Sequence, residues 1–389
     1  MTRVLLRTSV ALLLLLATVL VGWRILEPAE VLATAETPYP APTSATRPRV
    51  TSGLSLAPLL FEDRLRLYGS KHQVRADEPV TGRFVRTARW SLRRWPQQLS
   101  GVVTSGTTVV SRWSDGLLVG QDGRTGKVLW RTSGPDAPDY AGHRTGAAAV
   151  WSPPGLRTGA GIVVVAQGQD LFGYDVSTGT ERWHTATPPG CTGGFTTGDR
   201  YLCATGGYDL GSGAALRSGP AGPFTALGCP VAGSDCAGFR DGAGHGWLTR
   251  GGVPQRSVAL DSPAVTIAGG VPVSTANGLV TAYRPDGGVK WTWPATGVRV
   301  LGGNSTRILL MTPRRELVGL DAATGERRFQ FGLFFGKQEG ERGNGEWVAS
   351  GVLVSERFVA IERKNATAPD DPDSPTYYFS SESVLLAAI

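Results

Sequence analysis

The stretch Asp122-Gly123-Arg124-Thr125-Gly126-Lys127-Val128-Leu129-Trp130 decides the fold, because its pattern returns along the chain. A glycine follows the aspartate by four residues and precedes an aromatic residue by another four. The further copies are Asp175 with Gly179 and Trp183, Asp321 with Gly325 and Phe329, and Arg284-Pro285-Asp286-Gly287 with Trp291. The interval of four residues from the glycine to the aromatic residue is kept in all four copies, which indicates one structural unit repeated along the chain.

The pattern predicts a β-hairpin in each copy. Short apolar runs, such as 117–121 and 317–320, lie before the turns and read as strands. Asp and Thr oxygens can satisfy the turn backbone, and the glycine can adopt a positive φ. An aromatic residue on the next strand can bury about 150–250 Å² against a neighbouring sheet. Such sheets bury both faces when they stack around an axis, whereas sandwiches in tandem would not explain the spacing.

These repeats resemble the Asp-x-x-Thr-Gly-x-x-x-Trp repeat of the pyrroloquinoline-quinone-like (PQQ-like) β-propellers, of a membrane-anchored, actinobacterial type. The resemblance covers about residues 83–389 and implies an all-β fold, a single propeller of four-stranded blades. We count six blades. Five of them end at Trp130, Trp183, Trp247, Trp291 and Phe329, and the sixth closes the ring. Seven is the alternative, because the stretches before Trp247 and after Phe329 can hold further strands.

The two ends of this region predict how the ring closes. The last residues, Leu385–Ile389, align with 317–321, the strand before a turn, and the chain then stops. Near the start, the strand around Trp90 has no complete repeat before it. We therefore expect the strand of Leu385 to pair with the strand of Trp90 and to complete the last blade.

An apolar segment, Thr8–Trp23, lies near the N-terminus and follows Arg3 and Arg7. With the residues before it, the segment reaches the roughly 20 residues that cross a bilayer. We predict a signal anchor over 1–26 in the plasma membrane, with the N-terminus in the cytoplasm and the propeller outside. The alternative is a signal peptide cleaved near Ala33-Thr34-Ala35, which would release a secreted protein.

Residues 27–82 are rich in Pro, Thr and Ala, which favours an extended linker and lead-in before the propeller. The net charge is +7, but the basic residues are scattered apart from a modest group around Arg86 and Arg93. Nucleic-acid binding would need them clustered on one face, so we expect no nucleic-acid partner. An anionic lipid surface or wall polymer is the alternative partner for this charge.

Four cysteines lie in one region: Cys191, Cys203, Cys229 and Cys236. An even number outside the cytoplasm favours disulfides, and three connectivities are open. We favour the local pairs, 191 with 203 and 229 with 236, because each closes a short loop. The spacings do not fit a zinc site. The four histidines are His72, His143, His184 and His245, and none falls in a metal or nucleophile motif.

We therefore expect a non-catalytic scaffold with a protein partner at the cell envelope, without cofactor or metal. A surface sensor or carbohydrate-binding propeller is the first alternative, and the 11 tryptophans could serve it. A quinoprotein dehydrogenase is the second. The enzymes that this chain resembles have eight blades, a longer chain, two adjacent cysteines over the quinone and a calcium ion. The sequence has no Cys-Cys pair.

Overall fold

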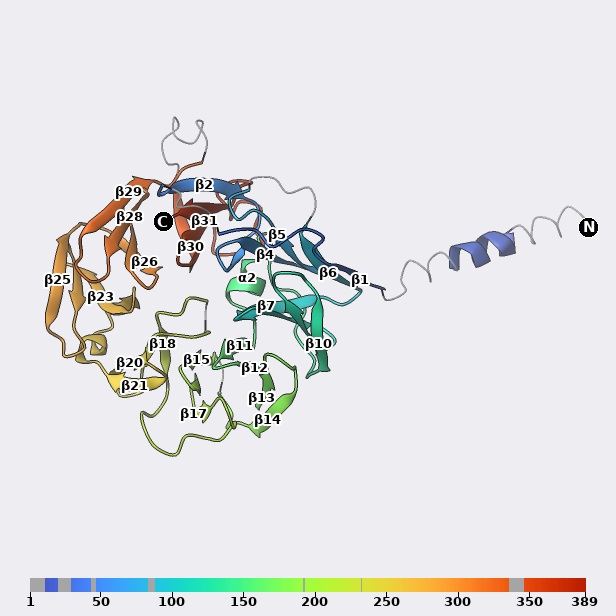
Figure 1. Ribbon diagram of the computed structural model, residues 1–389, viewed down its shortest axis with the longest axis horizontal. Helices are drawn as coiled ribbons and strands as arrows, with labels where there is room; N and C mark the ends of the chain where they lie inside the picture. The colour runs from blue at the N-terminus through green and yellow to red at the C-terminus, as the bar shows by residue number, and fades with distance from the viewer. Residues whose placement is uncertain are drawn as a thin grey trace, which may run out of the picture.

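The computed structural model describes residues 11–19, 29–42, 47–82, 88–191, 193–231, 233–335 and 346–389. These residues form a β-propeller of eight antiparallel sheets around a central axis (Figure 1). The predicted number of blades, six or seven, is therefore wrong. Six sheets have the predicted four strands, whereas blade 1 has five and blade 4 has three.

Blades are numbered in chain order, with the innermost strand first. Blade 1 contains β3 Leu59–Phe61, β4 Leu65–Ser70, β5 Gln73–Asp77, β6 Trp90–Trp95 and β1 Ala29–Ala33, and blade 2 contains β7 Leu99–Ser105, β8 Thr108–Trp113, β9 Leu117–Asp122 and β10 Val128–Ser133. Blade 3 contains β11 Leu156–Gly159, β12 Ile162–Gln167, β13 Asp170–Asp175 and β14 Glu181–Ala186. Blade 4 contains β15 Phe195–Thr197, β16 Arg200–Cys203 and β17 Gly206–Asp209.

Blade 5 contains β18 Thr225–Leu227, β19 Gly238–Arg240, β20 Gly246–Arg250 and β21 Val253–Arg256, and blade 6 contains β22 Val265–Ala268, β23 Val271–Ala276, β24 Leu279–Tyr283 and β25 Val289–Pro294. Blade 7 contains β26 Arg299–Gly303, β27 Arg307–Met311, β28 Glu316–Asp321 and β29 Arg327–Gly332. Blade 8 contains β30 Trp347–Val354, β31 Phe358–Asn365, β32 Val384–Ala388 and β2 Arg49–Leu54. The helix α2 Ala147–Trp151 and the 3₁₀ helix η1 Val258–Asp261 lie between blades.

The middle strands are buried on both faces, because each sheet packs against a neighbour on either side. All six residues of β8 and all five of β32 are buried. This double burial explains why these strands read as nearly continuous apolar runs instead of alternating with polar residues.

The repeated motif joins consecutive blades. In the first copy, Asp122 accepts backbone hydrogen bonds from Arg124 and Thr125 at 3.0 and 2.8 Å, and Gly126 has φ of 74°. The indole of Trp90, from the blade before, packs against Gly126 and donates to the Gly123 carbonyl at 2.8 Å. The motif therefore provides a turn for its own blade and a seat for the indole of the preceding blade.

Three further indoles make the same contact. The rings of Trp130, Trp183 and Trp291 lie against Gly179, Gly213 and Gly325, and their Nε1 atoms donate to carbonyls of the next blade at 2.8, 2.7 and 3.2 Å. We call each such contact an indole lock. The four locks join blades 1 to 2, 2 to 3, 3 to 4 and 6 to 7.

Blade 4 carries a copy of the motif that the sequence analysis missed. Asp209 accepts the backbone amide of Ser212 at 2.8 Å, and Gly213 donates to the Asp209 carbonyl at 2.8 Å. Four residues after this glycine stands Arg217 instead of an aromatic residue. The sequence of blade 4 therefore lacks the aromatic residue that marks the other copies.

Trp247 does not end a blade as predicted. It lies on β20, the third strand of blade 5, and β21 follows as the outer strand. The turn at Asp241 joins β19 to β20 and not the last two strands. Blade 5 is thus a complete blade without the motif in its usual place.

The ring closes through a different N-terminal strand from the one predicted. β32 pairs with β2, with Leu385 opposite Gly53 and Ala388 opposite Arg49. The strand of Trp90 pairs instead with β5 and β1, so the predicted pairing of Leu385 with Trp90 is wrong. An N-terminal strand does complete the last blade, as expected, but it comes from residues 49–54.

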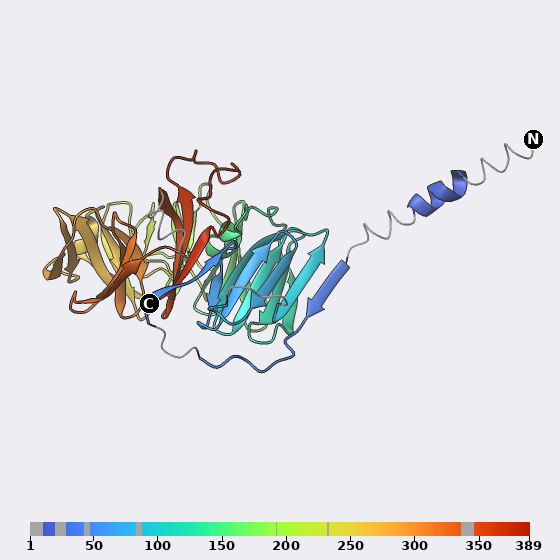
Figure 2. The same cartoon turned by 90° about the horizontal axis from the view of Figure 1, so that it is seen from above.

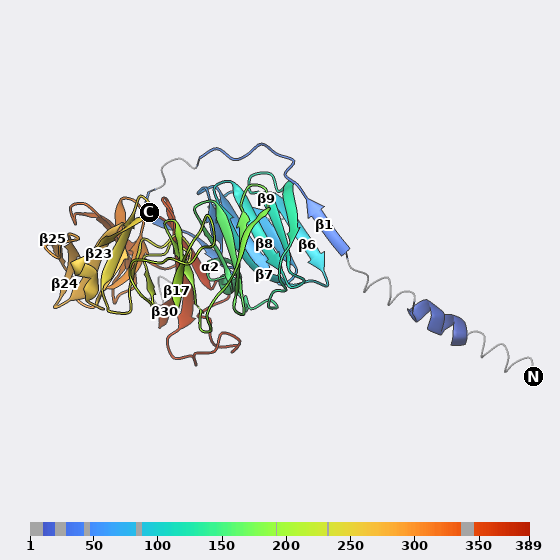
Figure 3. The same cartoon turned by 90° about the horizontal axis from the view of Figure 1, so that it is seen from below.

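The predicted boundary at residue 83 is wrong for the same reason. Strands β2 to β5 lie within residues 27–82, and β1 adds to the outer edge of blade 1. Residues 34–42 run along one face of the ring, opposite the face from which the loop after β31 projects (Figures 2 and 3). The lead-in that was expected to be a linker is therefore largely part of the propeller.

The predicted membrane segment is described only at residues 11–19, which are helical. Within the described ranges, no helix combines the length and the apolar character needed to cross a membrane. The rest of the predicted segment, as well as Arg86, lies outside the described residues.

Candidate functional site: the centre of the ring

One loop enters the centre of the ring, where propellers commonly hold ligands. This loop, residues 228–236, connects β18 to β19, and we call it the plug (Figure 1). Position 232 is outside the described residues. A disulfide between Cys229 and Cys236 closes the plug at its base.

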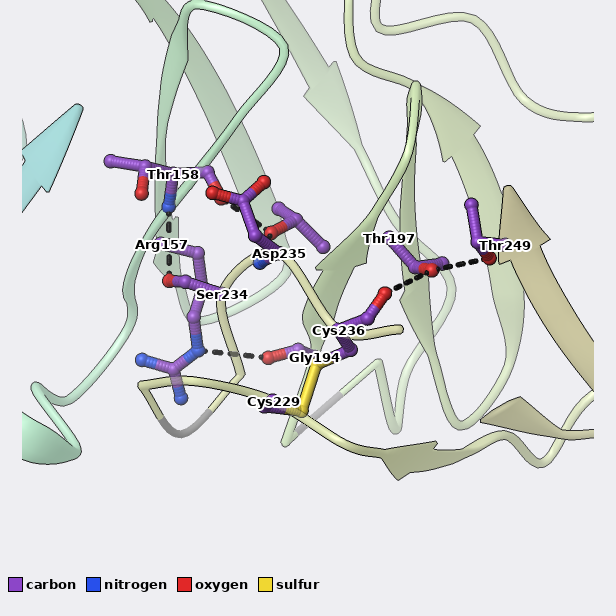
Figure 4. The surroundings of a disulfide bond; sticks show 10 residues. Arg157, Thr158, Gly194, Thr197, Cys229, Ser234, Asp235, Cys236 and Thr249 are labelled. Atoms are coloured by element: carbon purple, nitrogen blue, oxygen red, sulfur yellow. Dashed lines mark hydrogen bonds between the residues drawn. A yellow bond between two sulfur atoms is a disulfide. The ribbon is translucent and has the colours of Figure 1, made fainter. Parts of the chain in front are cut away.

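Buried threonines of blades 3 and 4 hold the plug (Figure 4). The Asp235 amide donates to the Thr196 hydroxyl and the Cys236 amide to the Thr196 carbonyl, both at 2.9 Å. The Thr197 hydroxyl donates to the Cys236 carbonyl at 2.7 Å, and the Thr158 amide donates to the Ser234 hydroxyl at 3.2 Å. Because both threonines of β15 are fully buried, the plug is a fixed part of the ring.

The plug divides the central space into three cavities. A cavity of 190 Å³ lies between the plug and the inner strands of blades 1, 2, 3 and 8, and one of 320 Å³ lies toward blades 6, 7 and 8. The third, of 530 Å³, lies between the plug, α2 and blade 8. Each cavity includes plug residues in its lining, so the chain itself occupies the axis of the ring.

Asp235 is the acidic residue of the plug and lines two of these cavities. Its backbone has φ of 47°, in the left-handed region that Asp and Asn tolerate better than most residues. The side chain is accessible from the cavities, yet desolvation by the surrounding strands raises the pKa of its carboxyl group. The ionised form therefore opposes folding above the ordinary pKa of an aspartate.

Replacing Asp235 by Asn should raise the melting temperature at pH 7. The unfolded chain loses the proton at a lower pH than the folded chain, so the carboxylate destabilises the fold once the pH passes the folded pKa. We expect a gain at pH 7 and no gain at pH 3, where the Asp235 carboxyl group is protonated and as uncharged as the Asn side chain. Scanning fluorimetry at the two pH values measures this, with Asp286→Asn on an exposed turn as control. An equal gain at both pH values would contradict it.

The second disulfide joins Cys191, in the lead-in to blade 4, to Cys203 on β16. The structure thus contains both of the predicted local pairs. They lie in the region of blades 4 and 5, where Arg217 replaces the aromatic residue and the indole lock is missing. The crosslinks therefore reinforce two neighbouring blades that no indole lock joins to each other.

The histidines do not converge on a common site. His72 contacts the Gln97 carbonyl at 2.8 Å, and His143, His184 and His245 lie 2.7, 2.9 and 3.6 Å from different aspartates. Among the described residues, no group of three His, Cys, Asp or Glu side chains could hold a metal ion.

The residues do not fit pyrroloquinoline quinone as the resembling enzymes hold it. Those enzymes place two adjacent cysteines over the quinone, whereas the disulfides here span 12 and 7 residues. The described ranges also contain no cluster of three His, Cys, Asp or Glu side chains that could hold the accompanying calcium ion. The number of blades, by contrast, does not separate this chain from the enzymes, because both have eight.

Two long insertions meet on one face of the ring. Residues 134–155, which include α2, lie against the loop 366–383, which projects from that face in Figure 2. The Arg144 guanidinium lies 4.3 Å from the centre of the Tyr378 ring and donates to the Ser380 carbonyl at 2.6 Å. The Thr145 hydroxyl donates to the buried Glu362 carboxylate at 2.5 Å. The loop is therefore displayed in a fixed position.

A family model named PQQ_2 and described as "Outer membrane protein assembly factor BamB" matches residues 24–196, less than half of the chain. No curated protein matches the chain. Among solved structures, BamB from Moraxella catarrhalis is 14% identical, with a TM-score of 0.43 and coverage of 92% of this chain and 99% of that chain.

Two further solved structures are similar over most of the chain. The computationally designed Ika8 protein is 14% identical, with a TM-score of 0.45 and coverage of 89% of this chain and 98% of that chain. A europium-containing methanol dehydrogenase is 12% identical, with a TM-score of 0.43 and coverage of 85% and 90%. The family match over residues 24–196 and the repeated turns with their indole locks make the chain similar to the PQQ-like β-propellers.

Proposed function

We propose that this propeller is a non-catalytic scaffold that binds a protein partner at the cell envelope. The plug is the observation that carries the proposal. A disulfide and buried threonines fix it on the axis, where a propeller enzyme would need room for its cofactor and substrate. The protein partner would then bind at the outer edges of the blades or at the loops on the two faces of the ring. The BamB description of the matching family model supports a role in protein assembly.

Membrane attachment is part of the proposal and rests on the sequence alone. The apolar segment Thr8–Trp23 would anchor the chain in the plasma membrane, with the propeller outside. If the segment is cleaved, the same scaffold is secreted.

A sugar-binding propeller would need exposed aromatic platforms on which sugar rings can stack. No tryptophan is exposed among the described residues, and Trp95, Trp247 and Trp293 are half-buried. The four indoles of the locks are buried between blades. The scaffold is therefore the function that the geometry favours.

A quinone titration tests the non-catalytic part of the proposal. We expect no stoichiometric change in the absorption spectrum when the purified chain is mixed with pyrroloquinoline quinone and calcium. A stoichiometric spectral shift would overturn the proposal, because a non-catalytic scaffold does not bind the quinone.

Crosslinking in native membranes tests the scaffold part. A photoreactive residue in place of Thr376, on the exposed loop of the insertion face, should yield a discrete adduct with a second protein. The same residue in place of Leu129, exposed on the outer strand of blade 2, is the matched probe for the rim. Absence of any discrete adduct from either position would contradict the scaffold function.

A further inference from the structure

The largest of the three cavities around the plug is lined by a single charged side chain. It has a volume of 530 Å³ and lies between α2, the plug and blade 8. Among its described lining residues only Glu362 is charged, whereas alanine, glycine, proline and valine residues and the indole of Trp151 form most of the wall. Ser152, Pro230 and Ser350 of the lining are exposed, so the cavity is open to solvent.

The Glu362 carboxylate is buried and accepts hydrogen bonds from neutral groups. The residue lies on β31 and is 6% exposed. The Thr145 hydroxyl donates to Oε1, and the Ser350 hydroxyl donates to Oε2 at 2.9 Å. A carboxylate that leaves water loses solvation free energy, which two hydroxyl donors offset only in part. A cation in the cavity would supply the missing positive charge.

The guanidinium groups next to this site in the sequence bind other acceptors. Arg144 donates to the Ser380 carbonyl and Arg363 to the Glu382 carbonyl, both at 2.6 Å. Both groups thus hold the loop 366–383, and the described lining of the cavity contains no Lys, Arg or His. The carboxylate therefore remains available to a cation that enters from solvent.

The Trp151 indole places apolar surface beside the carboxylate. Its Nε1 atom donates to the Pro58 carbonyl at 2.8 Å, which fixes the ring. A Cβ atom added to Gly351 would lie 2.9 Å from the indole ring and 3.6 Å from Oε2 of Glu362. The glycine thus lets the indole and the carboxylate approach the same point of β30. A ligand with a charged head and an apolar stem matches this pair of surfaces.

We propose that this cavity binds an alkylammonium group, with its nitrogen at the Glu362 carboxylate and its alkyl stem against the apolar wall. A metal ion is a poorer match, because the described residues contain no group of three His, Cys, Asp or Glu side chains that could hold one. A free amine and a lysine side chain of another protein offer the same chemistry. The inference goes beyond the proposed function and does not depend on it.

Ligand-observed NMR titration of the full chain with n-butylammonium tests the site. This ion is the lysine side chain as a free molecule, and n-butanol is the control ligand of equal length without the charge. We expect the ion to bind about tenfold more tightly than the alcohol, because a hydrogen bond between two charged groups is stronger than one to a neutral group. Equal affinity for the two ligands, or no binding of either, would overturn the inference.

Three variants locate the bound ion. Glu362→Gln keeps the size of the side chain and should lower the affinity for n-butylammonium to that for n-butanol. Ala148→Leu fills part of the cavity and should weaken the binding of both ligands. Glu356→Gln is the matched control and should bind like the wild type, because this carboxylate also accepts a serine hydroxyl, from Ser305 at 2.7 Å, but lines the cavity toward blades 6 to 8.

Circular dichroism shows whether each variant is folded. A folded Glu362→Gln variant that still prefers the ion would overturn the inference. If that variant does not fold, Ala148→Leu decides, and unchanged binding by Ala148→Leu would overturn the inference.

A capped peptide with one lysine in a Gly/Ser background identifies the source of the ammonium group. If the peptide displaces n-butylammonium, the site takes a lysine side chain of another protein. If only the free ion binds, the ligand is a small amine. Both results support the inference, and the crosslinking and quinone experiments test the scaffold function separately.

Discussion

A chain that begins at Ala57 should lose cooperative unfolding, whereas a chain that begins at Arg49 should keep it. The shorter chain lacks β2, which pairs with β32 at five positions and buries Leu54 and Ser52. Each lost backbone hydrogen bond costs about 1 kcal/mol, so the loss reaches at least about 4 kcal/mol before the exposed apolar surface is counted. Thermal and urea unfolding followed by circular dichroism measure the difference.

The chain that begins at Arg49 is the matched control, because it lacks β1 but keeps β2. The side chains of β1 are all exposed. The backbone groups of β6 that lose β1 lie at the outer edge of blade 1, where water replaces the lost bonds. Arg89 loses its bonds to residues 37 and 38 but keeps Glu78 at 2.7 Å, so we expect the loss of β1 to cost less than the loss of β2. A synthetic peptide of residues 47–58 should restore cooperativity to the shorter chain. If both chains unfold alike without peptide, β2 does not close the ring.

Trp183→Ala should destabilise the fold by about 3–5 kcal/mol. The indole is 7% exposed, lies between Gly173 of its own blade and Gly213 of the next, and donates to the Leu210 carbonyl at 2.7 Å. Its removal opens a cavity between blades 3 and 4 and leaves a buried carbonyl without its donor. The free energy of unfolding in urea measures the loss.

Two substitutions calibrate this result. Trp183→Phe keeps most of the packing and loses the N–H donor, so it should cost less than the alanine variant, mainly about 1 kcal/mol for the hydrogen bond. Trp293→Ala removes a half-buried indole from the outer strand of blade 6 and should cost about 1 kcal/mol. A loss at Trp183 no larger than that at Trp293 would show that the indole lock does not hold the blades together.

The sequence predicted the structure correctly where residues close together in the chain determine both a turn and its packing. The aspartate, the glycine and the aromatic residue of each copy act within one hairpin and one contact to the next blade, so their spacing predicted the propeller and its repeats. The local disulfide pairs followed from similarly short loops. These features need no knowledge of distant residues.

The errors fall where the repeat is incomplete or the contact is distant in sequence. Blade 4 was missed because Arg217 stands in place of the aromatic residue, and blade 1 because its strands follow a Pro-rich lead-in. The pairing of β32 with β2 joins strands at opposite ends of the chain, and many apolar strands could serve as the partner. The plug has no periodicity of its own, and only the fold brings Asp235 to the axis.

The closure of blade 8 also sets the order of events while the chain is being made. Thr51 and Leu386 are hydrogen-bonded across 335 residues, so β2 emerges long before its partner exists. At 5–20 residues per second, that interval is on the order of tens of seconds. During this time β2 and the unfinished edge of blade 8 are open to pairing with other chains. The nascent protein therefore needs protection from aggregation until β32 has been added.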